Sequence, residues 1–207
     1  MRAASSWRQA SWCAIDLELT GLDARADHIV AIGAVPIERG RVLCDQALYT
    51  LVRTRRPSQP DALRLHRLGP AELATAPKLE EALERLAGML AGRVPVFHTA
   101  AVERAFLRPA LRMRGIRLDR CADTEVLGRL WLAARDGAAP RALPLVRLAA
   151  LLGHPHERPH HALADAIATA SAFVTLASIL ERDRPQTVTS LTRARTALAP
   201  VRRLGPS

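Results

Sequence analysis

The sequence has few aromatic residues, few cysteines and no long hydrophobic run. Phenylalanine, tryptophan and tyrosine make up 3% of its 207 residues, which is too few to predict a platform that stacks nucleic-acid bases. The three cysteines are odd in number and set in apolar segments, so the sequence predicts neither a disulfide framework nor a zinc site and favours the reducing cytoplasm. No apolar stretch approaches the length that spans a bilayer, and we expect no membrane partner.

Basic residues are abundant, and nearly all of them are arginine. Lysine and arginine number 30 against 20 acidic residues, which gives a formal net charge of +10. An excess of this size attracts polyanions, of which nucleic acid is the first candidate. Because Lys78 is the only lysine, a genome-wide bias toward Arg and Ala would produce the same excess, and charge alone does not define the partner.

Alternating and β-branched residues predict three strands at the start of the chain. Segments 12–19 and 28–37 are separated by turn-like residues and predict a hairpin, and segment 41–52 alternates well enough for a third strand. Helical spacing and short apolar runs alternate further along. We expect helices at 79–90, 101–113, 124–134, 144–152 and 161–181, and strands at 94–97 and 118–122. This order predicts an α/β fold in which a mixed five-stranded sheet is flanked by helices.

The length of the chain predicts one domain with short tails. We expect a flexible N-terminal segment at 1–11, the domain at 12–182 and an Arg-rich C-terminal tail at 183–207, with a helix near 187–198. The first residues have no apolar core and do not resemble a secretory signal.

Two carboxylates stand at the end of the first expected strand. Asp16 and Glu18 are two residues apart, so strand alternation places both side chains on one face. The other face carries Cys13, Ile15 and Leu17, which suit the core. Two carboxylates on an apolar strand repel each other unless a cation or a proton compensates their charge, and a divalent metal ion is the natural compensation. Taken alone, such a pair is also common at solvated strand ends.

Three segments of the chain resemble the motifs of a known enzyme family. Residues 14–22 (AIDLELTGL) and 29–35 (IVAIGAV) are similar to the first motif of the DEDDh (DnaQ-like) exonucleases, which include the proofreading subunit of bacterial replicative polymerase. Residues 97–107 are similar to the second motif, and residues 160–166 (HHALADA) closely resemble the last, His-x-Ala-x-x-Asp-Ala. The resemblance implies an RNase H-like fold and 3′→5′ exonuclease activity with two divalent cations, Mg²⁺ or Mn²⁺.

The second motif departs from the family at three positions. Thr99 stands where the family usually has Asn, Val102 where it has Phe, and Glu103 where it has the third acidic residue, an Asp. The extra methylene of Glu103 moves the carboxylate, and metal geometry is sensitive to such displacements. These departures keep open the alternative of a catalytically weakened exonuclease-fold protein that acts in nucleic-acid binding.

The resemblance assigns a catalytic or metal-binding role to four carboxylates. Asp16 would bridge both metal ions, and Glu103 would support the second of them. Glu18 and Asp165 would bind the ion that activates water. We therefore expect hydrolysis of single-stranded or frayed 3′ ends, with DNA favoured over RNA, and release of nucleoside 5′-monophosphates. The sequence leaves open whether the chain acts alone, as a homodimer or with a polymerase.

A histidine and several loop residues complete the site that the resemblance implies. His160, five residues before Asp165, would be the general base, whereas its neighbour His161 matches a variable position. In the segment of His66, Arg67 replaces the Gly of the family. The expected substrate contacts are Thr20, Gly21, Leu22, His66, His98 and Thr99.

Three arginines recur at helical spacing after the second motif. Arg104, Arg108 and Arg112 are four residues apart and predict one stripe along a helix. Such a stripe suits phosphate groups, but it is equally typical of a solvated helix face.

Overall fold

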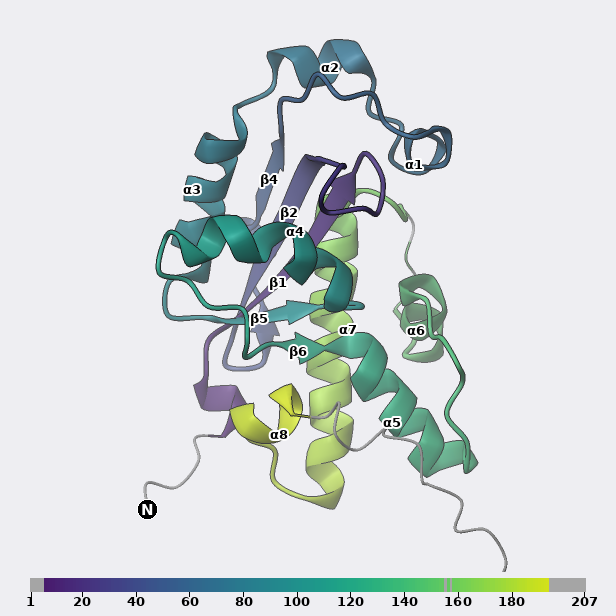
Figure 1. The fold of residues 1–207 in the computed structure, drawn as a ribbon. Helices are drawn as coiled ribbons and strands as arrows, with labels where there is room; N and C mark the ends of the chain where they lie inside the picture. The colour runs from purple at the N-terminus through teal and green to yellow at the C-terminus, as the bar shows by residue number, and fades with distance from the viewer. Residues whose placement is uncertain (1–5, 155, 157, 194–207) are drawn as a thin grey trace, which may run out of the picture.

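The computed structural model describes residues 6–154, 156 and 158–193. A mixed sheet lies at its centre, and helices cover both faces of the sheet (Figure 1). The strands run in the order β3-β2-β1-β5-β6, and β4 pairs with β2 along the same edge as β3. Their bounds are β1 Trp12–Leu19, β2 Ile29–Glu38, β3 Arg41–Val42, β4 Leu48–Leu51, β5 Val94–Phe97 and β6 Ala122–Asp123.

The five expected helices are present, with ends that differ from the expectation by only one or two residues. Their bounds are α3 Leu79–Leu90, α4 Ala101–Arg112, α5 Thr124–Asp136, α6 Leu145–Leu151 and α7 Ala162–Asp183. Two short helices, α1 Pro60–His66 and α2 Pro70–Thr75, are not predicted by hydrophobic spacing. Each begins with proline, whose fixed φ suits the first helical position. Together they arch over the end of the sheet at which β1 ends (Figure 1).

The expected third strand is divided in two, so the sheet has six strands and not five among the described residues. A 3₁₀ turn, Cys44–Gln46, separates β3 from β4, and both strands pair antiparallel with β2. Pro36 lies in β2 between the two paired stretches, and proline has no N–H to donate to a neighbouring strand. The expected strand at 118–122 is likewise reduced to β6, although Leu118 is buried.

Both ends of the domain extend beyond the expected bounds of 12–182. In the segment expected to be flexible, Trp7 is fully buried and its Nε1 donates a hydrogen bond to Glu181 Oε1 at 3.0 Å. Large aromatic side chains contribute strongly to a core when they are buried. In the expected tail, α8 Val188–Thr192 buries Val188 and Leu191. Residues 6–11 and 183–193 are therefore part of the packed domain, while 1–5 and 194–207 lie outside the described residues.

Alternation along β1 divides the core into two halves. Ala14 packs in the cluster that contains the apolar residues of α7, whereas Cys13 and Ile15 pack in the cluster formed with α3 and α4. Asp16 and Glu18 continue the face of Ala14 because strand side chains alternate. Both carboxylates therefore point toward the layer of α7.

The helix α7 crosses the sheet closely and carries the last motif. It has 22 residues, and 18 of them in a row have a mean hydropathy of 1.8. Contrary to the expectation from the sequence, the helix is thus long and apolar enough to cross a membrane by length and composition alone. In this fold the helix packs along β1 and β2 (Figure 1). Gly33 in β2 permits this approach, because a Cβ at that position would overlap the backbone carbonyl of Ala162. The contact sets the first turn of α7, with Asp165, beside the end of β1.

Candidate active site

Three carboxylates from distant parts of the chain converge at the end of β1. Asp16 and Glu18 come from β1, and Asp165 comes from the first turn of α7. One oxygen of each lies within 4.8 Å of the others. The structure thus brings together the acidic residues of the first and last motifs, which the sequence separates by more than a hundred residues.

The electrostatics of this acidic cluster, defined as Asp16, Glu18 and Asp165, are unfavourable without a cation. Burial raises the pKa of Asp16 well above its usual range, and the charges of Asp165, Glu103 and Glu18 raise it further. Burial and the charge of Asp165 raise the pKa of Glu18 to about 8. Glu18 Oε1 is buried and finds no hydrogen-bond donor within the described part of the chain. Oxygen ligands of this kind fit a hard divalent cation.

Glu103 lies next to the acidic cluster without joining its tight core. It is buried in the first turn of α4, and its charge is one of the causes that raise the pKa of Asp16. Burial, and to a lesser degree the charge of Asp123, raise the pKa of Glu103 itself to about 8. Its Oε2 is buried and lacks a partner among the residues that the structure describes. The residue is therefore placed to bind a cation, but it is not one of the three whose oxygens lie within 4.8 Å.

The raised pKa values predict how pH and metal ions change the stability of the protein. Burial raises the pKa of Glu18 and Glu103 from 4.5 to about 8. The folded protein therefore favours the protonated carboxyl groups. Their contribution to the free energy of unfolding is complete below pH 4.5 and is lost as pH rises through 8. Calorimetry in EDTA is expected to show a Tm that falls between about pH 5 and 8, whereas Mn²⁺ is expected to raise the Tm most at pH 8.

A double variant, Glu18→Gln with Glu103→Gln, serves as the control for this stability prediction. It removes two of the three carboxyl groups whose pKa values are raised, so its Tm in EDTA is expected to change less with pH and to respond less to Mn²⁺. Equal melting temperatures of the natural protein in EDTA and in Mn²⁺ at both pH values would contradict a metal site in the cluster.

His160 faces the same region as the carboxylates. Its backbone N–H donates a hydrogen bond to Asp165 Oδ2 at 3.0 Å, and its side chain helps to line the cavity beside Glu18. Its φ of 63° is in the left-handed region, which non-glycine residues seldom adopt. The geometry is compatible with the predicted general base.

The neighbouring His161 has a structural position. Its Nδ1 accepts a hydrogen bond from the N–H of Ala164 at 3.5 Å, so it caps the first turn of α7. Its ring stacks on Tyr49, with ring centroids 4.6 Å apart. These contacts distinguish the capping His161 from His160, which lines the cavity.

A further histidine, His156, contacts the acidic cluster although no sequence motif points to it. Its Nε2 contacts Asp165 Oδ1, and its side chain is buried. No spacing rule connects it to Asp165, because it precedes that residue by nine positions in a segment rich in histidine and proline. Only the folded loop before α7 shows the contact.

A cavity of about 460 Å³ opens beside the acidic cluster. Three of the predicted substrate contacts, Gly21, Leu22 and His66, line it together with Glu18 and His160. The side chain of Leu22 is 78% exposed and stands at its edge. The volume is in the range of sites for small ligands, so the cavity can accommodate one terminal nucleotide.

His66 lines this cavity and carries a hydrogen-bond donor without an acceptor among the described residues. Its Nδ1 accepts the N–H of Leu68 at 3.0 Å, so the neutral ring carries its proton on Nε2. Burial and the nearby His160 lower the pKa of His66, which favours that neutral ring. Nε2 is buried and has no acceptor within the described ranges. The following Arg67 has a φ of 60°, a conformation that glycine adopts easily, which explains why the family has Gly at the matching position.

The other three predicted substrate contacts lie elsewhere. Thr20 is fully buried; its Oγ1 donates to Asp27, and its backbone N–H donates to the carbonyl of His28. Both donors of Thr20 are thus used inside the fold, and its contact with the substrate stays a prediction.

His98 and Thr99 face the start of α5 and are not among the residues that line the cavity. His98 Nδ1 lies 2.9 Å from Thr124 Oγ1, and Thr99 Oγ1 donates to Glu125 Oε2 at 2.9 Å. Asp123 caps α5 by accepting the N–H of Val126, as expected of an aspartate before a helix.

Buried carboxylates that converge beside a histidine and a cavity define a candidate metal-dependent hydrolase. The model of the RNase T family, described as exonuclease, matches residues 13–173. The chain belongs to this DnaQ-like 3′→5′ exonuclease family.

Similar proteins support this family assignment. A DNA polymerase III subunit epsilon-like protein of Rhodobacter capsulatus is 35% identical over 168 residues, which are 80% of this chain and 23% of that protein. A DNA polymerase III PolC-type of Thermotoga petrophila is 28% identical over 180 residues, which are 86% of this chain and 13% of that protein. The chain therefore spans less than a quarter of the length of these relatives.

Solved structures share the fold at low sequence identity. Exonuclease X in complex with 5′ overhanging duplex DNA has a TM-score of 0.62 at 23% identity, covering 88% of this chain and 98% of that chain. Exonuclease I of E. coli in complex with a dA16 oligonucleotide has a TM-score of 0.70 at 17% identity, covering 84% of this chain and 42% of that chain. The mixed α/β exonuclease fold expected from the sequence is thus confirmed.

Proposed function

We propose that the protein is a metal-dependent 3′→5′ exonuclease that acts on single-stranded or frayed 3′ ends and releases nucleoside 5′-monophosphates. The convergence of Asp16, Glu18 and Asp165 within 4.8 Å carries this proposal. The adjoining cavity supports it, because it is lined by His160 and has room for one nucleotide. A cavity of this size suits a chain end better than the middle of a duplex.

The acidic cluster and Glu103 would hold two divalent cations, Mg²⁺ or Mn²⁺. When bound, such ions act as Lewis acids toward water and phosphate oxygen. Asp16 is close enough to the other acidic groups for the charges of Asp165, Glu103 and Glu18 all to raise its pKa. It is therefore the residue best placed to contact both ions.

The remaining residues of the cavity would orient the substrate and move the proton. His160 would accept the proton of the attacking water on an imidazole nitrogen. His66 would donate its Nε2–H to an oxygen of the terminal nucleotide. Leu22, exposed at the edge of the cavity, would contact the terminal base. The terminal nucleotide enters most easily where base pairing is weak.

DNA is proposed as the preferred substrate, and association with a polymerase as one mode of action. Relatives named as DNA polymerase III subunits or PolC-type polymerases support both points. The fold neighbours solved with a dA16 oligonucleotide and with duplex DNA are consistent with a DNA strand in the cavity. A homodimer is the other assembly proposed.

A weakened enzyme that acts in nucleic-acid binding is the second candidate function. It is favoured by one observation, the position of Glu103 outside the set of oxygens within 4.8 Å. If Glu103 cannot complete the second cation site, the protein would bind 3′ ends and hydrolyse them slowly.

A digestion of 5′-labelled single-stranded DNA tests the proposed function. In Mn²⁺ we expect the labelled strand to shorten stepwise, nucleoside 5′-monophosphates to accumulate, and EDTA to stop both. Matched RNA and a duplex with a mismatched 3′ end measure the preference for DNA and for frayed ends. Binding without shortening would favour the second candidate, and internal fragments or release from the 5′ end would refute exonuclease action at 3′ ends.

A further inference from the structure

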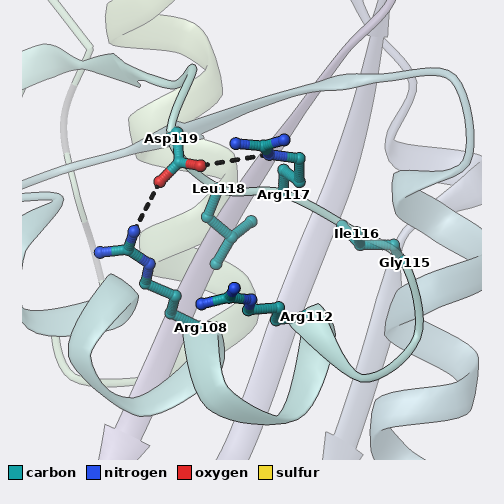
Figure 2. Close-up of a pocket in the computed structure, with 7 residues that line it drawn as sticks. All are labelled: Arg108, Arg112, Gly115, Ile116, Arg117, Leu118 and Asp119. Atoms are coloured by element: carbon teal, nitrogen blue, oxygen red, sulfur yellow. Dashed lines mark hydrogen bonds and ion pairs between the residues drawn. The ribbon is translucent and has the colours of Figure 1, made fainter.

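A second hollow, of about 420 Å³, lies at the far end of α4 from the active-site cavity. Figure 2 shows Arg108 and Arg117 joined to Asp119, and Arg112 on the other side of Leu118 without such a contact. We propose that this arginine hollow binds backbone phosphates of the substrate strand upstream of its 3′ end. The inference rests on the proposed function, because it extends the path of the strand whose end enters the active site.

The hollow has more positive charge than its single carboxylate can balance. Asp119 Oδ1 lies 3.0 Å from Arg108 and 3.8 Å from Arg104, and its Oδ2 lies 3.4 Å from Arg117. Arg112 has no ion pair among the described residues and extends into the hollow (Figure 2). Three guanidinium groups therefore lie within 4 Å of one carboxylate, and the fourth, of Arg112, is not paired with it. Asp119 fixes the positions of Arg108 and Arg117, two of the arginines that line the hollow. The excess positive charge remains available to an anion.

The helix α4 connects the hollow with the active site. Val102 in its first turn lines the active-site cavity, and Arg112 in its last turn lines the hollow. The two residues are ten positions apart, which corresponds to about 15 Å along the helix axis. Arg104 and Arg108 lie between these ends at four-residue spacing. Around the axis of α4, Arg112 lies about 80° from Val102 and Arg104 about 160°. A strand that leaves the cavity would therefore approach the hollow on the side of Arg112.

The chemistry of the hollow suits phosphate groups and not bases. Guanidinium groups bind phosphate oxygens in a bidentate way, and no aromatic side chain that could stack a base lines the hollow. The side chains of Arg108 and Arg117 are 54% and 83% exposed. Exposed arginines of this kind bind the phosphates of a strand of any sequence. An exonuclease that advances along its substrate requires such binding.

The experiment compares a long and a short substrate in the double variant Arg112→Ala with Arg117→Ala. For a single strand of about twelve nucleotides, we expect KM to rise about tenfold with kcat unchanged, and the salt dependence of log KM to weaken by about 1.4, or about 0.7 for each lost phosphate contact. Hydrolysis of thymidine 5′-(p-nitrophenyl phosphate), which is too short to reach the hollow, is expected to stay unchanged.

Two further variants control for folding and for general charge. Arg112→Lys with Arg117→Lys keeps the charge and is expected to recover most of the affinity for the long strand. Arg182→Ala removes an exposed arginine from the last turn of α7, about 25 Å along the helix from Asp165, and is expected to behave as the natural protein. If the alanine double variant had the same KM and the same salt dependence as the natural protein, the proposal would be overturned.

If the proposed function itself were wrong, the result would differ from the one that refutes the arginine hollow. In that case the natural protein would not hydrolyse the p-nitrophenyl ester in Mn²⁺. Fluorescence anisotropy of the labelled long strand would then test the hollow without any turnover. Weaker binding of the alanine double variant, with Arg182→Ala unchanged, would support the arginine hollow, and equal binding by all variants would refute it.

Discussion

Replacing Asp16 with asparagine is expected to lower kcat by about a thousandfold or more and at the same time to raise the Tm of the metal-free protein. The activity is lost because Asp16 is the carboxylate that the other acidic groups surround. The stability rises because burial and like charges hold the pKa of Asp16 far above its usual range, so its ionised form destabilises the fold near neutral pH. Digestion of a labelled strand and calorimetry in EDTA measure the two effects.

An exposed aspartate provides the control for this prediction. Asp45→Asn changes the same charge in the 3₁₀ turn between β3 and β4, and it is expected to leave both activity and Tm as in the natural protein. Activity of the Asp16 variant within a few-fold of the natural protein would contradict the proposed metal site. If the Tm of the Asp16 variant in EDTA were lower than that of the natural protein, only the electrostatic explanation of the stability change would be contradicted.

Replacing His160 with alanine is expected to lower kcat by about 10² to 10⁴, with little change in Mn²⁺ affinity. The reason is that His160 contacts Asp165 through its backbone N–H, while its ring faces the cavity. The backbone contact survives the substitution, and the proton acceptor is lost. Single-turnover hydrolysis of a single strand and a Mn²⁺ titration separate these two quantities.

The adjacent histidine offers a matched variant. His161→Asn keeps a side chain that caps the first turn of α7, so it is expected to retain most of the activity. If the asparagine variant lost more activity than His160→Ala, the assignment of the general base to His160 would be wrong.

The sequence predicts much of the fold because each element has a strong local pattern. Alternation along 12–19 places Asp16 and Glu18 on the face opposite Cys13 and Ile15, and the structure has this arrangement. Helical spacing gives α3 within its observed bounds. The convergence of Asp165 with the β1 carboxylates follows from the family motifs and not from any local pattern.

Features that depend on contacts between distant parts of the chain have no local signal in the sequence. Trp7 is ordered by Glu181, which is 174 residues away in the chain, so no local signal separates its segment from a flexible tail. The contact of His156 with Asp165 depends on the path of the loop before α7. The arch of α1 and α2 has too few apolar residues for a helical pattern, although Pro60 and Pro70 mark where its helices begin.

Two residues that differ from the family motifs, Arg67 and Thr99, have left-handed backbone conformations. Thr99 and Arg67 have φ values of 61° and 60°, a region in which Asn and Gly are more easily accommodated. These are the residue types that the family has at the two positions. The backbone at both positions thus has a conformation that Asn and Gly favour although the side chains differ, and Thr99 is held by its hydrogen bond to Glu125.

The metal centre is tested most directly by diffraction from crystals soaked in Mn²⁺ and a nucleoside 5′-monophosphate, recorded at the manganese absorption edge. We predict one anomalous peak bound by Asp16, Glu18 and Asp165. We predict a second peak between Asp16 and Glu103. A single peak would favour the weakened enzyme, and the absence of manganese from these carboxylates would contradict the proposed metal-dependent active site.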